Sequence, residues 1–146
     1  MIALLDVNIL VALAWPNHVH HEAAHGWFDA ERRHGWATCP VSESGFVRLS
    51  SNPTAVGEAK TPAEAIALLQ RVCRLSGHVF WADDVALSRS PLVAKTKLVA
   101  YRQVTDAHLL AIALRHRGRL ATADAGVRGL VPDGFQADQV VALVSG

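Results

Sequence analysis

Short apolar runs alternate along the chain with longer segments whose apolar positions recur at a helical period. Short runs bounded by glycine, proline and polar residues are typical of buried strands, and the helical period is typical of helices packed on one face. The runs predict strands at residues 2–5, 36–39, 78–81, 120–122 and 139–144. The periodic segments predict helices at residues 8–14, 20–33, 40–49, 61–75 and from 105 or 106 to about 117. This alternation predicts an α/β protein whose mainly parallel sheet carries helices on both faces.

Local signals support one helix start and two loops. Thr61 is a capping residue, Pro62 suits the first helical turn, and Glu64 closes a capping box. The polar segments at residues 50–60 and 88–103 predict loops, and we expect the second loop to lie near the mouth of a site.

The chain has 146 residues, of which 51% are hydrophobic and 18% charged, which is typical of one globular domain spanning residues 1–146. A domain of this length buries enough surface to fold without a disulfide or a structural metal. Cys39 and Cys73 form no metal-binding or redox motif, so we expect reduced thiols in a cytoplasmic protein. The apolar run at residues 9–15 is far shorter than the ~20 residues of a membrane-spanning helix, so we expect no membrane segment.

The net charge of +1 does not by itself indicate a nucleic-acid-binding protein. Most of the 14 basic residues are arginine, which suits bidentate contacts with phosphate. They form local groups at Arg32 and Arg33, at Arg71 and Arg74, and at Arg115, Arg117 and Arg119. Each group taken alone is also typical of an ordinary solvated helix face.

Four acidic residues occupy corresponding places in the predicted elements. Asp6 ends the first strand, and Asp124 comes just after the fourth. Glu43 and Asp106 lie at the starts of helices. Each acid alone is typical of a helix cap, a turn or a solvated surface. In a parallel sheet, however, the carboxyl ends of the strands and the adjacent helix N-termini share one edge, so the joint pattern predicts that all four acids meet there.

Carboxylates that meet in this way repel one another unless a cation lies between them. Oxygen-only ligation favours a hard divalent ion, so the sequence predicts a Mg²⁺ or Mn²⁺ site. Such an ion lowers the pKa of a bound water and stabilises charge on a phosphate under attack. Asn8, Thr105 and Thr122 are candidates for polar support of the carboxylates or of bound waters. Arg48, about one helical turn past Glu43, is a candidate phosphate contact.

The segments around these acids resemble the four acidic motifs of PIN domains. They are Ile-Ala-Leu-Leu-Asp-Val-Asn at residues 2–8, Glu43, Val-Thr-Asp-Ala-His-Leu-Leu-Ala at residues 104–111, and Leu-Ala-Thr-Ala-Asp at residues 120–124. Among PIN domains, the chain is most similar to the VapC toxins of bacterial toxin–antitoxin systems. The resemblance covers essentially the whole chain and keeps the order of the motifs.

The resemblance implies a PIN-like three-layer α/β/α sandwich and a Mg²⁺- or Mn²⁺-dependent endoribonuclease that leaves a 5′-phosphate and a 3′-hydroxyl. By the family pattern, Asp6, Glu43, Asp106 and Asp124 are the metal ligands, and Asn8 and Thr105 support them. The family also implies a homodimer, an RNA substrate, and a cognate VapB-type antitoxin that occludes the site.

A different reading comes from residues 21–25, where His21, Glu22 and His25 match the H-E-x-x-H pattern of zinc metalloproteases. A catalytic zinc ion needs a third protein ligand. No extended metzincin-type continuation follows His25, and only about 20 residues precede the motif to support its helix. A helix face with solvated histidines is therefore the favoured interpretation.

Two further alternatives keep the fold and change the function. Phosphatases of the haloacid-dehalogenase type use Asp-x-Asp after the first strand, whereas this chain has Asp6 and Asn8, and its three lysines do not precede the late acid at position 124 in the expected way. The other alternative is a catalytically silent PIN-like module that binds RNA or protein. Four retained acids argue against it, because carboxylates without a metal repel RNA phosphate.

Overall fold

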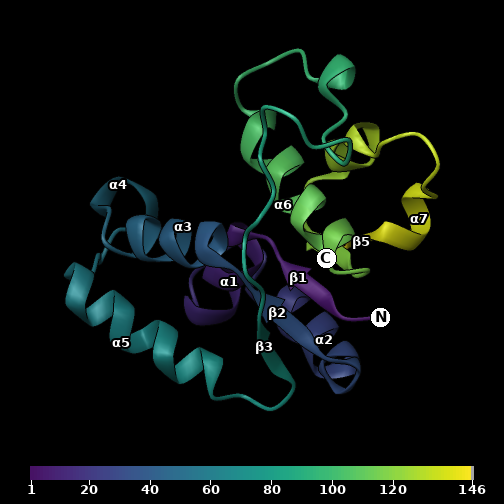
Figure 1. Cartoon of the computed structure of the whole chain (residues 1–146). Helices are drawn as coiled ribbons and strands as arrows, with labels where there is room; N and C mark the ends of the chain where they lie inside the picture. Colours follow the sequence, from purple (N-terminus) through teal and green to yellow (C-terminus); the bar gives the residue numbers. More distant parts are fainter. Residues whose placement is uncertain (146) are drawn as a thin grey trace.

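A sheet of five strands lies at the centre of the structure, a computed structural model in which residues 1–145 are described (Figure 1). The strands are β1 (Ala3–Leu5), β2 (Trp36–Thr38), β3 (His78–Phe80), β4 (Arg119–Thr122) and β5 (Val141–Leu143). Their order is β3-β2-β1-β4-β5, and every neighbouring pair is parallel. The predicted mainly parallel sheet is therefore confirmed. Because β1 is the middle strand, the residue that follows it, Asp6, lies at the centre of the carboxyl edge.

Five helices correspond to the five predicted ones. They are α1 (Val7–Ala14), α2 (His21–Glu31), α3 (Pro40–Ser50), α5 (Pro62–Cys73) and α6 (Gln103–Arg115). The predicted capping box at the start of α5 is present: the Glu64 N–H donates to Thr61 Oγ1 at 3.2 Å, and the Thr61 N–H donates to Glu64 Oε1 at 2.9 Å. This reciprocal pair satisfies two amides at the open end of the helix.

Several short elements depart from the sequence prediction. Helix α4 (Pro53–Val56) lies in the segment predicted as a loop, where Asn52 accepts a hydrogen bond from the Thr54 N–H and caps it. Helix α7 (Ala137–Val140) occupies the first two residues of the strand predicted at 139–144, so that strand begins only at Val141. The 3₁₀ turns η1 (Arg32–His34), η2 (Lys95–Lys97) and η3 (Ala125–Leu130) were also not predicted. Elements this short carry too few residues for a detectable period.

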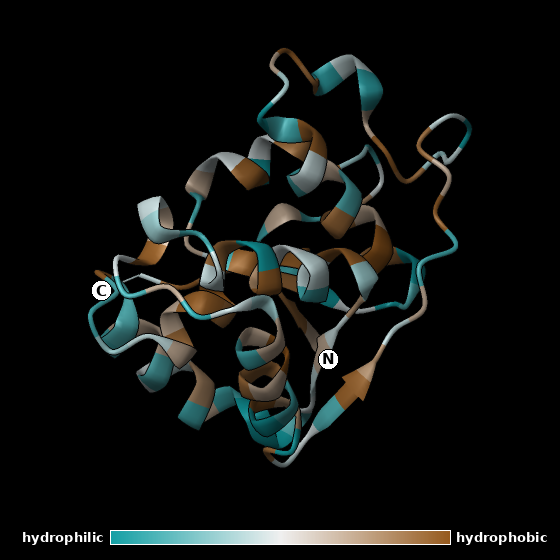
Figure 2. Cartoon of the chain, turned by 90° about the vertical axis from the view of Figure 1, so that its left-hand side faces the viewer, coloured by the Kyte–Doolittle hydropathy of each residue, from teal (hydrophilic) through white to brown (hydrophobic). Residues whose placement is uncertain are grey.

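The sheet separates two hydrophobic cores, because successive side chains of a strand point to opposite faces. On one face, Leu4 and Leu120 pack against α6. On the other face, Ala3 and Leu5 pack against residues of α1, α2, α3 and α5. Figure 2 shows hydrophobic segments gathered around the sheet, with hydrophilic residues toward the outside of the helices. This arrangement confirms the predicted three-layer α/β/α sandwich.

Both cysteines carry free thiols: Cys39 is buried and Cys73 is half-buried. Across residues 1–145, no helix combines the length and the apolar character required to cross a bilayer.

Candidate active site

Asp6 is the most enclosed acid of the carboxyl edge, with only 5% of its surface exposed. The Thr122 hydroxyl, at the end of β4, donates a hydrogen bond to Asp6 Oδ2 at 2.7 Å. Burial raises the pKa of the Asp6 carboxyl above its usual range, the hydrogen bonds from Thr122 and from the Val7 amide oppose that rise, and the charge of Asp124 adds to it. The ionised form of Asp6 therefore depends on its hydrogen bonds, and it gains further from any cation nearby.

Asp124 follows β4 and is exposed. Its backbone N–H donates to Thr122 Oγ1 at 3.1 Å, and its Oδ1 accepts a hydrogen bond from the Gly126 N–H at 2.8 Å. Thr122 thus links Asp6 to Asp124 across the ends of two neighbouring strands. These bonds engage Oδ2 of Asp6 and Oδ1 of Asp124.

Asp106 lies in the first turn of α6 and is half-buried. Its pKa is raised to about 6, first by burial and then by the charges of Asp6 and Asp124. Because charge repulsion between carboxylates falls with distance, the three aspartates lie near enough to disfavour one another's ionisation. The three aspartates come from segments that are more than 100 residues apart at their extremes.

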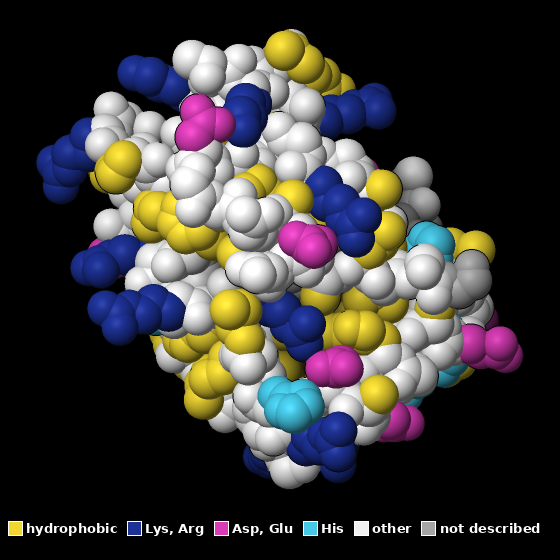
Figure 3. Space-filling view, turned by 90° about the vertical axis from the view of Figure 1, so that its right-hand side faces the viewer, with side chains coloured by type: hydrophobic (Ala, Val, Ile, Leu, Met, Phe, Trp, Pro, Cys, Tyr) yellow, Lys and Arg dark blue, Asp and Glu magenta, His cyan; other side chains and the backbone are white. Residues whose placement is uncertain are grey.

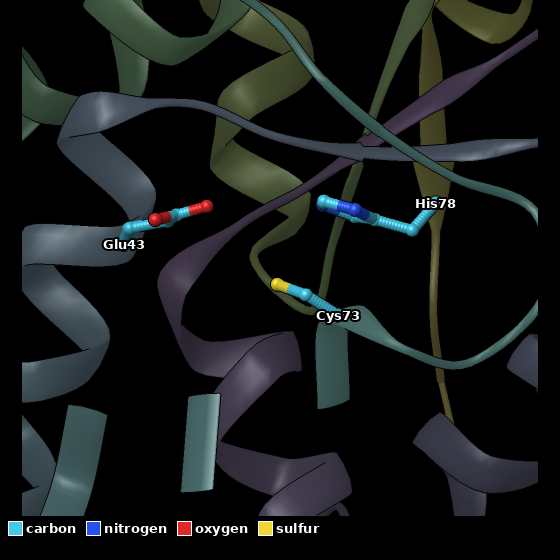
Figure 4. Close-up of side chains that lie close together, drawn as sticks. All are labelled: Glu43, Cys73 and His78. Carbon is cyan, nitrogen blue, oxygen red and sulfur yellow. The ribbon is translucent and has the colours of Figure 1, made fainter. Parts of the chain in front are cut away.

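Glu43 is also at the carboxyl edge, in the first turn of α3, but its carboxylate belongs to a different group of side chains. The Thr38 hydroxyl donates to Glu43 Oε2 at 2.6 Å and lies 2.8 Å from His78 Nε2. Cys73 completes this group, which Figure 4 shows converging from α3, α5 and β3. The structure therefore brings together three of the four predicted acids, and it holds the carboxylate of Glu43 with Thr38 instead.

The neighbours of Cys73 change the pKa of its thiol. Burial, and then the charge of Glu43, raise its pKa to about 11, while a hydrogen bond with Thr38 acts in the opposite direction. Burial also lowers the pKa of His78 below its usual range, and the charge of Glu43 partly offsets this. Sequence reasoning missed Thr38, Cys73 and His78, because no spacing motif links residues so far apart in the chain.

The predicted supporting residues take different places around the aspartates. Thr122 bonds directly to Asp6, as described above. Asn8 is exposed on the first turn of α1 and lines, together with Asp124, a cleft of about 480 Å³. Thr105 is exposed immediately before Asp106.

The same cleft is lined by His18 and His20, which sequence reasoning did not assign to this site. The predicted phosphate contact, Arg48, is exposed and shares an open groove of about 590 Å³ between α3 and α5 with Glu43. The loop predicted near a site, at residues 88–103, lines a separate cleft together with Pro132 and Asp133.

The histidines of the H-E-x-x-H pattern, predicted to be solvated, are half-buried and bonded to backbone carbonyls, and they are not gathered around a metal position. His21 Nδ1 lies 2.7 Å from the Ala12 carbonyl, and His25 Nε2 lies 3.0 Å from the Leu13 carbonyl. A carbonyl only accepts, so both rings donate, and they cap the free carbonyls at the end of α1. Within residues 1–145, no third ligand joins these two rings in a metal-binding group. The pattern is thus explained by the packing of α2 on α1.

The arginine groups are partly engaged in ion pairs. Arg115 pairs with Asp84 at 3.1 Å, and Arg119 pairs with Glu31 at 2.9 Å. Figure 3 shows lysine and arginine side chains at separate places on one face, among hydrophobic and acidic ones. These observations favour the ordinary surface interpretation for Arg115 and Arg119.

The comparison with known proteins agrees with this fold. The sequence profile of the PIN domain family matches residues 3–130, the span from β1 to the end of η3. Ribonuclease VapC39 of Mycobacterium tuberculosis is 50% identical over 127 residues, which cover 87% of this chain and 91% of that protein. The chain belongs to the VapC group of the PIN domain family.

Other relatives and solved structures are similar to this VapC-type PIN domain. Ribonuclease VapC38 of Mycobacterium tuberculosis is 52% identical over 127 residues, 86% of each chain. The crystal structure of VapBC2 from Rickettsia felis, bound to a promoter DNA fragment, matches with a TM-score of 0.60 at 13% identity and covers 90% of this chain and 96% of that one. FitAcB from Neisseria gonorrhoeae matches with a TM-score of 0.55 at 19% identity, covering 97% and 96%. The two structures support the fold alone.

Proposed function

We propose that this PIN domain is the toxin of a VapBC-type toxin–antitoxin pair, an endoribonuclease that cleaves RNA phosphodiester bonds with Mg²⁺ or Mn²⁺ held at Asp6, Asp106 and Asp124. The observation that carries the proposal is the nearness of these three carboxylates at the carboxyl edge, where the charge of Asp124 raises the pKa of Asp6 and the charges of Asp6 and Asp124 raise that of Asp106. None of the ion pairs among residues 1–145 involves any of the three. A site of this charge needs a cation from outside the chain.

The donor set fits a hard divalent ion, since all three side chains offer carboxylate oxygens. When bound, such an ion supplies charge neutralisation and a water of lowered pKa beside the scissile phosphate. The chain itself holds the ligands. Thr122 engages Oδ2 of Asp6, and the Gly126 amide engages Oδ1 of Asp124, so the remaining oxygens of both are left for the ion.

Further residues complete the proposed site. Glu43 is its fourth acid, whose carboxylate leaves Thr38 to join the aspartates. Asn8 and Thr105, exposed at the mouth, support bound waters or the substrate. Arg48 contacts a phosphate of the RNA beyond Glu43.

The proposed partners are an RNA substrate, a cognate VapB-type antitoxin and a second copy of the chain. The names of the relatives, Ribonuclease VapC38 and VapC39, support the activity. The antitoxin partner is proposed from membership of the VapC group, whose toxins belong to toxin–antitoxin systems.

The test is cleavage of total RNA by the purified chain in Mg²⁺, in Mn²⁺ and in EDTA. Asp6→Asn and Asp106→Asn should each slow metal-dependent cleavage by about a hundredfold or more, the effect of losing roughly 3 kcal/mol of charge stabilisation. Asp29→Asn, at an exposed acid of α2, is the matched control and should leave the rate unchanged.

Manganese binding, measured by electron paramagnetic resonance, should weaken in the same two variants and not in the control. RNA that stays intact with every metal, while manganese still binds, would favour the non-cleaving module instead. Cleavage that survives Asp6→Asn would place the active site elsewhere.

A further inference from the structure

Glu43, Cys73 and His78 converge at one point outside the aspartate site. One ligand atom of each, a carboxylate oxygen, a sulfur and an imidazole nitrogen, lies within 4.8 Å of the other two, and all three side chains are half-buried (Figure 4). In a tetrahedral zinc site, the bond lengths of about 2.0–2.3 Å separate such atoms by roughly 3.4–3.6 Å. Side-chain movements of about 1 Å therefore complete a three-ligand site.

The surrounding fold holds Cys73 and His78 in these positions. Cys73 ends α5 and His78 begins β3, so only a short turn separates them. Gly77 in that turn has a φ of +92°, and a Cβ there would lie 2.5 Å from the Arg32 carbonyl oxygen, so glycine is required. The Trp36 indole donates to the Ser76 carbonyl at 3.0 Å and closes the turn against β2.

Further contacts orient the side chains of His78 and Glu43. The Trp36 ring packs against the His78 ring with centroids 4.7 Å apart, which fixes the imidazole. Thr38 Oγ1 lies 2.6 Å from Glu43 Oε2 and 2.8 Å from His78 Nε2, so one hydroxyl draws both toward the same point. A thiol, an imidazole and a carboxylate gathered in this way form a donor set for a borderline or soft cation, unlike the oxygen-only set of the aspartates.

We propose that Glu43, Cys73 and His78 form a second metal site, which binds Zn²⁺ or a cation of the same class. Thr38 stands beside it and supports the carboxylate and the imidazole. Three protein ligands leave one position open, as in zinc sites that exchange a water. The site is therefore expected to load and release its ion rather than to serve as a permanent structural centre.

Occupation of this site has a consequence for the nuclease, which rests on the proposed function. Glu43 is the fourth acid of the proposed Mg²⁺ site. When its carboxylate binds zinc beside Cys73, it is not available to join the aspartates. Zinc at the second site is thus expected to inhibit Mg²⁺-dependent cleavage without occupying the aspartate site.

The binding test uses Co²⁺ as a spectroscopic substitute for zinc and requires no RNA. The purified chain titrated with Co²⁺ should develop the near-ultraviolet charge-transfer band of a thiolate–cobalt bond. Cys73→Ser should abolish the band, and His78→Gln should weaken Co²⁺ binding by more than about tenfold, the loss that even an outer partner of a metal ligand causes. His34→Gln, at an exposed histidine, is the matched control.

Two outcomes overturn the proposal: a wild-type chain that shows no thiolate–cobalt band, or a Cys73→Ser variant that keeps it through the remaining thiol of Cys39. Far-ultraviolet circular dichroism verifies that each variant is folded. Asp106→Asn should retain the band, which separates this site from the aspartates.

The inhibition test adds Zn²⁺ to the Mg²⁺-dependent RNA cleavage assay. Wild-type cleavage should be inhibited, whereas cleavage by Cys73→Ser, compared with its own rate without zinc, should resist zinc. Inhibition that is equal in both proteins overturns the link through Glu43. If RNA is never cleaved while the cobalt band is present, the proposed function fails and the metal site stands.

Discussion

Asp106→Asn is expected to stabilise the metal-free protein while it removes metal-dependent cleavage. The pKa of Asp106 is raised to about 6 from an ordinary value of 3.8, by burial first and then by the charges of Asp6 and Asp124. An acid whose pKa is higher in the folded state holds its proton more tightly when folded, so its ionisation favours unfolding. The stability lost through Asp106 therefore grows as the pH rises from about 4 to about 6 and is constant at higher pH.

The magnitude follows from the raised pKa and the position of the side chain. Taken in full, the difference between the two pKa values corresponds to about 3 kcal/mol above pH 6. Asp106 is only half-buried, and screening by water reduces this to about 1.5 kcal/mol. Its place in the first turn of α6 favours the charged form by about 0.3–1 kcal/mol. Charge repulsion and desolvation of Asp106 still outweigh the helix dipole. The free energy of unfolding of Asp106→Asn should therefore exceed that of the wild type by about 1 kcal/mol.

The assay is urea unfolding in EDTA at pH 7.5 and at pH 4.5, with Asp29→Asn as the control. The gain of Asp106→Asn should be largest at pH 7.5 and clearly smaller at pH 4.5, where folded Asp106 is already protonated. In excess Mg²⁺ the wild type should be more stable than Asp106→Asn, because only the wild type gains much stability from the bound ion. A variant that is less stable than the wild type at pH 7.5 in EDTA, or a gain that is equal at both pH values, would refute the reasoning.

Three further substitutions test other parts of the structure. Thr122→Val removes the hydrogen bond that lowers the pKa of Asp6, so the acid limb of the cleavage pH profile should move to higher pH, and the free energy of unfolding should fall by about 1–3 kcal/mol. His21→Ala leaves a carbonyl at the end of α1 without its donor and should cost about 0.5–1.5 kcal/mol in urea unfolding, with no change in metal content. Gly118→Ala places a methyl group against the ring of Trp81 and the backbone carbonyl oxygen of Ile2, and it should lower the unfolding free energy by about 1–3 kcal/mol, seen as a fall in Tm.

Each of these predictions has an outcome that contradicts it. A pH profile that stays in place in Thr122→Val would mean that the acid limb does not report Asp6. A zinc-dependent hydrolytic activity lost in both His21→Ala and Glu22→Ala would restore the metalloprotease interpretation. An unchanged Tm in Gly118→Ala would show that the Trp81 ring and the Ile2 carbonyl make room for the methyl group without cost.

The order of the elements, and the edge of the sheet at which the aspartates lie, are predictable from the sequence alone. Apolar runs and helical periods depend on local spacing, so all five strands and the five longer helices are where they predict them. The alternation of strands with helices also implies that the strands are parallel. Parallel strands end at one edge, and Asp6, Asp106 and Asp124 lie near one another there. The matches to the PIN domain family and to Ribonuclease VapC39 confirm the family that the motifs predict.

The partners of individual side chains, in contrast, follow from how distant segments pack together. Glu43 bonds to Thr38 and converges with Cys73 and His78, because β2 and β3 are adjacent strands and α5 ends beside them. His21 caps α1 because α2 folds back across its end. Side-chain direction and contacts between distant segments depend on packing, which a local sequence pattern does not contain. The edge of the sheet was therefore predictable, whereas the partner of each carboxylate on it was not.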